Sequence, residues 1–328
     1  MAKDTRLLLI DKDQVESLLG FDDALEAVRE AFRLHASGEG RVFPVVREKL
    51  ASGGVFGIKS GSVEQEKILG FKAAGFWSGN RALGGEPHQA TILLFDPDTG
   101  RPRCVIDGNV VTTLRTGAAG GLGLLRLARR DSARLCVFGT GVQARIQTRF
   151  ALSLMSGLRA LAYVSINGAP DERFEAEVGA EAAARACAVR HVSDRDGAVA
   201  ESDIVITATP GTGPLFSPDA VRPGTHINAV GADTAGKREL PEGLLGRAQL
   251  FVDDADQARA IGESQWAKEH PCVALGELLT GKRSFERQPD EITIFDMTGI
   301  ALQDLTVARL LLQRATAADA GTWVEWPW

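Results

Sequence analysis

Between residues 22 and 37, apolar side chains recur at the three- and four-residue spacing of an amphipathic helix. Gly38 follows the last of these positions and ends the predicted helix. Four β-rich runs, separated by Gly, Ser, Asn and Pro, then occupy residues 41–107. Residues 7–10 predict either a short strand or the lead into a helix. We therefore expect an N-terminal α+β domain that covers residues 1–115.

Beyond residue 134 the pattern changes to short apolar runs that alternate with helical stretches. The predicted strands cover residues 135–138, 161–166, 189–192, 203–208, 226–230 and 249–252. Alternating strands and helices are typical of an α/β fold with a parallel, doubly wound sheet. We expect this Rossmann-type domain to cover residues 116–304. The amphipathic helix over residues 304–316 is expected to return to the first domain, which then also includes residues 305–328.

The C-terminal end is unusually aromatic, with tryptophan at positions 323, 326 and 328. Two interpretations stand side by side. The segment is either a frayed terminus or a docking segment for a partner subunit.

The strongest single motif is the run VFGTGVQA, in which a buried strand breaks into G-x-G-x-x-A and a helix. Gly139 permits the tight turn, Gly141 lets the backbone approach a pyrophosphate, and Ala144 is small enough for the helix to pack on the strand. The N-terminus of the helix offers free N–H groups to the phosphates. The alternative is a plain strand-to-helix turn. We favour a nucleotide cofactor held by Gly139, Thr140, Gly141, Val142, Gln143 and Ala144.

Loops that follow the other predicted strands are expected to face the same cofactor, because ligands bind at the carboxyl ends of parallel strands. These candidates are Ser165, Asn167, Thr207, Ala208, Thr209, Val230 and Gly231. The second strand ends without the acidic residue that usually binds the ribose of NAD, and without an adjacent Arg for the phosphate of NADP. Asn167 can bond a ribose, whereas Asp171 and Arg173 point to opposite cofactors. We expect NAD or NADP and favour NAD.

Composition narrows the class of protein. The net charge is −6, and no block of Lys or Arg stands out, which argues against nucleic acid and an anionic membrane as partners. The four cysteines form no C-x-x-C motif, so neither a zinc site nor a disulfide framework is implied, and we expect no metal. The longest apolar run near the N-terminus is too short for a signal peptide, and no run approaches the ~20 residues of a membrane span. We expect a soluble, cytoplasmic protein.

Four cations stand among apolar or small neighbours in the N-terminal domain: Arg47, Lys59, Lys72 and Arg115. A buried cation needs an anion, and a substrate carboxylate is a natural partner. For any one of them alone, a salt bridge within the protein is the better interpretation. For the set beside a nucleotide site, we favour substrate binding.

Asp233 is the best candidate for an acid, because it follows a strand and a glycine at the carboxyl end of the sheet. A carboxylate there can exchange a proton with a substrate nitrogen if burial raises its pKa. An Asx turn or a helix cap is the competing interpretation. His88 is interpreted as a hydrogen-bonding loop residue rather than a proton donor.

With these residues in view, the chain resembles the ornithine cyclodeaminase/μ-crystallin family over nearly its whole length. The resemblance is carried by FPVVREKL, GFKAAGFW, HQATILLFDPDTGRP, TTLRTGAA, VFGTGVQA and GADTAGKREL, in the same order. It implies a homodimer in which a Rossmann domain accompanies a substrate and dimerisation domain, working on amino or imino acids with NAD(P). It also implies that Arg47, Lys72 and Arg115 hold the substrate carboxylate. Asp233 is then the general acid or base at the substrate nitrogen, and we count Lys72 with it as catalytic.

Within the family, FPVVRE, FDPDTG, VRPGTH and IGE are most similar to members that reduce a dicarboxylic imino acid. Such a substrate needs a second cluster of donors, for which Lys59, Ser60, Asn80 and Arg81 are candidates. An ornithine enzyme would instead need an acid for the distal ammonium, and Glu64 and Glu66 are the nearest. Our leading hypothesis is hydride transfer to a C=N bond. The alternatives are a cyclodeaminase, a ketimine reductase or alanine dehydrogenase, and a binding protein without turnover.

Overall fold

A computed structural model describes residues 6–326, which divide into two compact units. The first consists of residues 6–115 and 300–326, and the second of residues 116–299. Helix α9 (Ala301–Ala317) therefore belongs wholly to the first unit. The second unit ends at residue 299, whereas the sequence predicted that it ends at residue 304. Which unit binds which ligand stays a prediction.

The first unit is an eight-stranded mixed sheet, in the order β16-β1-β7-β6-β5-β4-β2 with β3 paired to β4. Its strands are β1 (Arg6–Ile10), β2 (Gly40–Val42), β3 (Val46–Lys49), β4 (Val55–Val63), β5 (Ile68–Phe76), β6 (His88–Phe95), β7 (Pro102–Asp107) and β16 (Thr322–Glu325). Its helices are α1 (Lys12–Leu18), α2 (Phe21–Ser37), α9, the 3₁₀ turn η1 (Ser78–Leu83) and the start of α3 (Gly108–Leu127).

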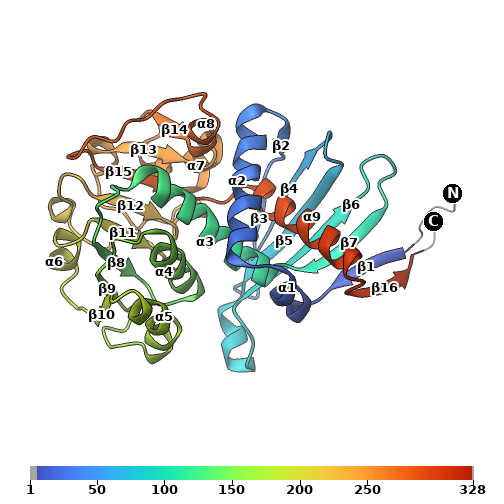
Figure 1. Cartoon of the computed structure of the whole chain (residues 1–328), viewed down its shortest axis with the longest axis horizontal. Coiled ribbons are helices and arrows are strands. Elements are labelled where there is room, and N and C mark those ends of the chain that lie inside the picture. The colour runs from blue at the N-terminus through green and yellow to red at the C-terminus, as the bar shows by residue number, and fades with distance from the viewer. Residues whose placement is uncertain (1–5, 327–328) are drawn as a thin grey trace. The chain divides into compact units, whose positions relative to one another are not determined.

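Helices α2 and α9 pack together and cover one face of this sheet (Figure 1). Glycines on the strands allow the close approach: a Cβ at Gly61 or Gly70 would contact Leu302 or Leu305 of α9. The prediction of helix α2 is confirmed, since it ends where Gly38 adopts a φ of +78°. Residues 7–10 form a strand, the first of the two alternatives.

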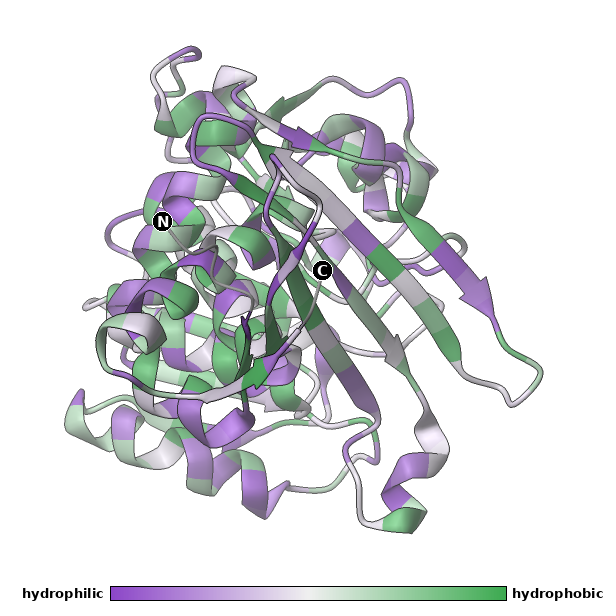
Figure 2. Ribbon diagram, turned by 90° about the vertical axis from the view of Figure 1, so that its right-hand side faces the viewer, coloured by the Kyte–Doolittle hydropathy of each residue, from purple (hydrophilic) through white to green (hydrophobic). Residues whose placement is uncertain are grey.

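The opposite face of the sheet carries apolar side chains that the described chain leaves partly exposed. Phe71, Leu93, Val105 and Leu9 are direct neighbours on β5, β6, β7 and β1, and all four are only partly buried. Figure 2 shows the hydrophobic bands on these strands. We call these four residues the outer row.

The aromatic C-terminal segment is not frayed over its described part. Residues 322–325 form β16, which pairs antiparallel with β1 of the same chain, and Arg6 lies over the ring of Trp323. Trp328 lies outside the described residues. Docking on a partner subunit stays untested.

The second unit confirms the predicted parallel, doubly wound sheet. Its strand order is β10-β9-β8-β11-β12-β15-β13-β14, and every pair is parallel. The strands are β8 (Arg134–Phe138), β9 (Ala160–Val164), β10 (Ala188–His191), β11 (Ile204–Thr207), β12 (His226–Ala229), β13 (Gln249–Val252), β14 (Cys272–Ala274) and β15 (Thr293–Asp296). The strand order reverses direction between β8 and β11, which is where ligands bind in such sheets.

Helical elements cover both faces of this sheet. They are the end of α3, α4 (Val142–Leu154), α5 (Glu172–Ala184), α6 (Arg195–Ala200), α7 (Ala255–Ile261), α8 (Leu275–Leu279), and the 3₁₀ turns η2 (Pro218–Ala220), η3 (Leu245–Arg247) and η4 (Glu263–Trp266). In Figure 1, α3, α4 and α5 lie in front of β8 to β12. On the other face, Phe138, Val205, Ile227 and Ile294 form a core with residues of α6 and α7.

The structure contains elements that the sequence pattern did not predict, chiefly α1, β14 and β15. Strand β15 has only four residues, yet it lies in the middle of the sheet and all four are buried. Within the described residues, no helix is long and apolar enough to cross a bilayer. All four cysteines are free thiols, and three of them are buried.

Helix α3 needs a glycine where it meets α4. A Cβ at Gly117 would lie 2.5 Å from Cδ2 of Phe150 and 2.8 Å from Cγ1 of Ile146, whereas one at Gly179 of α5 would meet nothing within 4 Å. We expect Gly117→Ala to lower the free energy of unfolding by about 1–3 kcal/mol through overpacking. Gly179→Ala is expected to raise it by ~0.5–1 kcal/mol, because alanine favours the helix. Urea denaturation of both variants checks this, and equal effects would contradict it.

Candidate functional site

The first unit buries two cations around one carboxylate. Lys72 on β5 and Arg115 on α3 are 4% and 8% exposed, and Asp304 on α9 is 1% exposed. Oδ1 of Asp304 accepts hydrogen bonds from Nζ of Lys72 at 2.8 Å and from Nε of Arg115 at 3.0 Å. Strand β5 and two helices far apart in the sequence therefore meet at one oxygen atom.

Neighbouring polar groups complete part of this arrangement. Nζ of Lys72 also donates to the hydroxyl of Thr112 at 3.2 Å, and Nη1 of Arg115 donates to Oε1 of Gln303 at 3.1 Å. Lys72 has a third N–H, and Arg115 has its Nη2 group, for which residues 6–326 provide no hydrogen bond. Both cations thus keep donors for a further anion.

Two more of the predicted cations lie on the same face of the sheet. Lys59 on β4 is directly opposite Lys72, and Arg47 on β3 is opposite Gly57, two residues earlier on β4. Side chains two positions apart on a strand share a face. The structure therefore brings Lys59, Lys72 and Arg115 together as buried cations, whereas for Arg47 it shows only a shared face of the sheet.

Charge and burial shift the pKa values in this cluster. Burial, followed by the charge of Arg115, lowers the pKa of Lys72 to about 7. Burial alone would raise the pKa of Asp304, but Lys72 and Arg115 outweigh it and hold the pKa below its usual range. Asp304 is therefore a carboxylate at neutral pH, and it offsets only part of the positive charge around it.

His88 lies beside this cluster at the start of β6, on the face that carries Lys72. Its Nδ1 lies 3.1 Å from Oδ1 of Asn109. Burial, followed by the charge of Lys72, lowers the pKa of His88 to about 4, so the ring is neutral at physiological pH. This agrees with a hydrogen-bonding role for His88.

The candidates for a second donor cluster do not come together. Ser60 lies on the opposite face of β4 from Lys59, and Arg81 is exposed in η1. Nδ2 of Asn80 donates to the carbonyl of Glu86 within the same hairpin. Of these candidates, only Lys59 lies with the buried cations.

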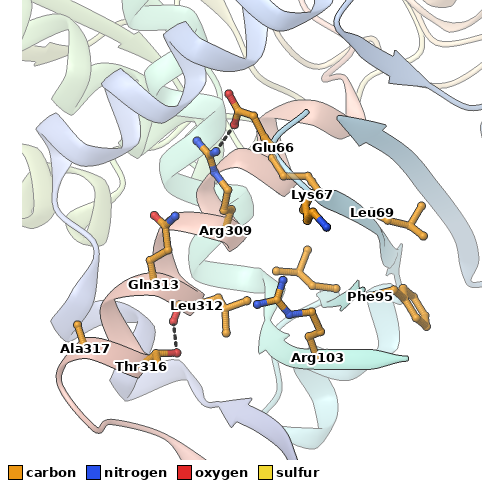
Figure 3. Close-up of a pocket in the computed structure, with 12 residues that line it drawn as sticks. Glu66, Lys67, Leu69, Phe95, Arg103, Arg309, Leu312, Gln313, Thr316 and Ala317 are labelled. Carbon is orange, nitrogen blue, oxygen red and sulfur yellow. Dashed lines mark hydrogen bonds and ion pairs between the residues drawn. The ribbon is translucent and has the colours of Figure 1, made fainter. Parts of the chain in front are cut away.

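A pocket of about 410 Å³ in the same unit is not this site. Glu66, Lys67, Arg103, Arg309 and Leu312 are among the residues that line it (Figure 3). Of the candidate residues from the sequence, only Glu66, considered for an ornithine ammonium, is among them. Glu66 forms an ion pair with Arg309 there. Glu66 is thus occupied by a cation of its own chain.

In the second unit, the G-x-G-x-x-A turn lies at the reversal of strand order. Gly139 has a φ of +103°, and a Cβ on it would lie 2.5 Å from the carbonyl oxygen of Ala208. A Cβ on Gly141 would meet no atom within 4 Å, so the space in front of the turn is open. Gly141 is the N-cap of α4, and no side chain caps the helix. These residues fit a pyrophosphate at the helix N-terminus.

The remaining predicted cofactor residues follow strands at the same edge. Thr207 ends β11, and Ala208 and Thr209 follow it. The backbone N–H groups of Val230 and Gly231 donate to the carbonyl of Thr207. Val142 and Gln143 begin α4, and Ala144 is fully buried against the sheet.

The loop after β9 is organised around its own hydrogen bonds. The hydroxyl of Ser165 donates to the carbonyl of Ala169 at 2.5 Å, and Oδ1 of Asn167 accepts from the N–H of Ala169 at 3.2 Å. Asp171 caps α5, and Arg173 forms an ion pair with Glu177 at 2.9 Å. A ligand at this loop would therefore lie near Asn167, which is exposed, and near Arg173, which is already paired with Glu177.

Asp233 is half-buried in the second unit. Its carboxylate is 39% exposed and forms an ion pair with Lys237 at 2.9 Å. The burial on which its role as an acid depends is therefore only partial. The N–H of Gly236, ahead of which an Asx turn or cap was the competing interpretation, donates to Oε1 of Gln265. The role of Asp233 stays a prediction.

Sequence reasoning missed two sets of acids. Asp304 was treated as the start of an amphipathic helix, although a lone acid between Gln303 and Leu305 in an apolar helix signals a buried partner. Glu239, Glu263 and Asp296 are fully buried in the second unit. Burial raises the pKa of Glu263 to about 8 and that of Asp296 to about 7, and it also raises the pKa of Glu239. Within residues 6–326, no group of three or more His, Cys, Asp or Glu could hold a metal ion.

Comparison with known proteins now identifies the family. The model of the ornithine cyclodeaminase/mu-crystallin family matches residues 6–319. The chain belongs to this family. The resemblance noted in the sequence is confirmed, and so is the Rossmann-like fold of the second unit.

Individual relatives cover almost the whole chain. Iminosuccinate reductase from Paracoccus denitrificans is 33% identical, over 97% of this chain and 100% of that enzyme. Its crystal structure in complex with NAD⁺ has a TM-score of 0.87 at 32% identity and covers 98% of this chain and 99% of that one. An archaeal alanine dehydrogenase dimer with bound NAD has a TM-score of 0.89 at 31% identity, over 97% and 99% of the two chains.

The cation cluster makes a stability prediction for Asp304→Asn. Arg115 stays charged at all ordinary pH values, so losing the carboxylate leaves a buried charge unpaired, which we expect to cost about 3–5 kcal/mol at pH 7. The folded pKa of Asp304 is lowered, so its contribution is present above the unfolded pKa of about 3.9 and is lost as the pH falls through the folded value. Urea denaturation at pH 7 and in acid measures the difference from wild type.

The matched control is Asp13→Asn, at an exposed position of α1 in the same unit. We expect a change within about 0.5 kcal/mol there. A similarly small effect at Asp304 would show that its ion pairs contribute little.

Proposed function

We propose that the protein is an NAD-dependent imine reductase that acts on an imino acid. The observation that carries this proposal is the excess of buried positive charge in the first unit. Lys72 and Arg115 are both buried, and within residues 6–326 Asp304 is the one carboxylate that accepts from both of them. A ligand carboxylate relieves this excess and accepts the donors that remain on Lys72 and Arg115.

The cofactor is the second part of the proposal. A nicotinamide dinucleotide supplies the hydride when bound, and the relatives crystallised with NAD⁺ or NAD support this choice. Residues 139–144 would hold the pyrophosphate, and Asn167 the ribose. NAD is favoured over NADP because Arg173, the nearest cation to the loop after β9 in sequence, is paired with Glu177.

The residues of this chain then have separate tasks. Lys72 and Arg115 fix the carboxylate of the imino acid, which orients its C=N carbon for hydride transfer. Reduction of a C=N bond also requires that the nitrogen be protonated. We assign that proton to Asp233, as the resemblance to the family implies.

For the substrate, we propose iminosuccinate, with L-aspartate as the product. The relative that is named for this activity is 33% identical over 97% of this chain. Lys59 and Arg47, on the same face of the sheet as Lys72, offer charge for a second carboxylate. Ornithine is disfavoured because Glu66 is paired with Arg309 and Glu64 is exposed in the turn after β4.

We also propose that the protein is a homodimer that buries the outer row, and that it is cytoplasmic. The outer row is apolar across four neighbouring strands and is partly exposed in the single chain. Apolar surface of this kind on a sheet is typical of an interface. The alanine dehydrogenase that shares the fold is described as a dimer.

The activity is tested by NADH oxidation with oxaloacetate and ammonia, with aspartate as the expected product. Lys72→Met removes a charged donor to the carboxylate, worth about 2–3 kcal/mol, and should lower kcat/KM by about 100-fold. Asp233→Asn should lower kcat by ~10²–10⁴-fold, the usual contribution of a general acid. Lys268→Ala, an exposed lysine of the second unit, is the control and should leave both constants unchanged.

Three results would change the assignment. Ammonia release from L-ornithine without net NADH oxidation would place the protein among the cyclodeaminases. Oxidation with pyruvate and ammonia alone would favour an alanine dehydrogenase. Full activity of both Lys72→Met and Asp233→Asn would contradict the mechanism.

The dimer is tested by light scattering of the purified protein, with an expected mass of twice 35.0 kDa. Phe71→Glu places a charge in the middle of the outer row and should yield a folded monomer, because a buried unpaired charge is costly. Leu125→Glu changes an exposed apolar residue of α3 and should leave the dimer intact. A monomeric wild type, or a dimeric Phe71→Glu, would contradict this interface.

A further inference from the structure

The buried carboxylate of Glu239 joins two loops at the carboxyl edge of the second sheet. Its Oε1 accepts from the N–H and the hydroxyl of Thr209, both at 2.7 Å, and its Oε2 accepts from the N–H of Gly231 at 2.8 Å. Thr209 follows β11 and Gly231 follows β12, which are neighbouring strands. One side chain therefore uses both of its oxygens to hold two separate loops.

The contact with the second loop depends on a glycine. A Cβ at Gly231 would lie 2.5 Å from the carboxylate of Glu239, a distance that Cβ atoms do not adopt. The backbone of Glu239 adds to the link, because its carbonyl accepts from the N–H of Leu215, in the loop that Thr209 begins.

Hydrogen bonds continue from Gly231 to Asp233. Nζ of Lys237 donates to the carbonyl of Gly231 at 3.2 Å and to Oδ1 of Asp233 at 2.9 Å. The peptide group that Glu239 holds is thus connected through one lysine to the carboxylate that we assign to proton transfer. The same loop is held from η4 by Gln265, which bonds Gly236 and the carbonyl of Lys237.

Two further carboxylates lie behind Glu239 in series. Oε1 of Glu263 accepts from the N–H of Glu239 at 2.6 Å and of Leu240 at 3.2 Å. Asp296, at the end of β15, accepts in turn from the N–H of Glu263 at 2.9 Å and of Ser264 at 2.8 Å. Each acid fixes the backbone of the next, so the position of Glu239 is set from the interior of the sheet.

We propose that Glu239 is a positioning residue that couples the loop after β11 to the loop after β12 and so sets the position of Asp233. The inference rests on the proposed function in that the first loop faces the cofactor and the second carries the general acid. Glu239 is fully buried, and we assign it no contact with either ligand. Its effect passes through Thr209, Gly231 and Lys237.

The alternative is that Glu239 merely stabilises the fold. Strands β11 and β12 are already joined by their own ladder from Ile204 to Thr207, which does not involve Glu239. Loss of the carboxylate therefore frees the loops and leaves the sheet intact. A structural role would instead loosen the strands.

The test compares Glu239→Gln with wild type by hydrogen exchange of the free protein and by steady-state kinetics. A glutamine has one acceptor oxygen, so one loop loses its partner. We expect faster exchange in residues 208–215 and 230–237, unchanged exchange in β8 and β12, and a kcat lower by about 10²-fold from misplacement of the acid, with KM for the imine nearly unchanged. Gly231→Ala should reproduce this pattern by displacing the carboxylate.

Two matched controls keep the result specific. Glu242→Gln is exposed and three residues away, and Gly246→Ala has no atom within 4 Å of its new Cβ. Both should match wild type. Wild-type loop exchange and kcat in Glu239→Gln, or faster exchange throughout the sheet, would overturn the proposal. A wild type that reduces no imine would instead refute the proposed function, while the exchange data would still decide whether Glu239 couples the loops.

Discussion

The first unit depends on the compensation of buried charge by a single carboxylate. Lys72 and Arg115 come from a strand and a helix, and both donate to the same oxygen of Asp304, which is 232 residues from Lys72 in the chain. A buried cation without such a partner would be costly, so the closing helix α9 cannot be replaced by an apolar one. Within residues 6–326, Lys72 and Arg115 share this one oxygen, and each keeps a donor for the anion that we propose as the ligand.

The second unit buries acids rather than cations, and backbone N–H groups stabilise them. Asp296, Glu263 and Glu239 are buried acids, and their hydrogen-bond donors are mainly backbone N–H groups at the carboxyl edge of the sheet. Loops in this position have many N–H groups without a ladder partner, and a carboxylate satisfies two or three of them at once. Buried acids therefore serve as rigid connectors where loops must hold a fixed shape. Cations would not serve, because they accept no hydrogen bonds.

Local patterns predicted most of the fold, and long-range partners account for what they missed. The strand and glycine turn at 135–141 and the alternation that follows were predicted because each signal lies within a few residues. Asp304 looks like an ordinary helical residue until β5 and α3 place their cations against it. Strand β15 has four residues and is defined by its central place between β12 and β13. The sequence could not show that Asp233 is only half-buried and that a nearby residue, Lys237, pairs with it.

The charge of Lys72 depends on what binds beside it. Burial brings the pKa of Lys72 to about 7, so the side chain is only partly charged in the free protein at neutral pH. An anion that binds beside it favours the charged form and raises that pKa, so binding above pH 7 takes up a proton. The guanidinium of Arg115 gives a constant attraction. Lys72 and Arg115 therefore combine one constant charge with one that becomes complete only when an anion binds. This limits the free energy that burying two cations costs in the free protein.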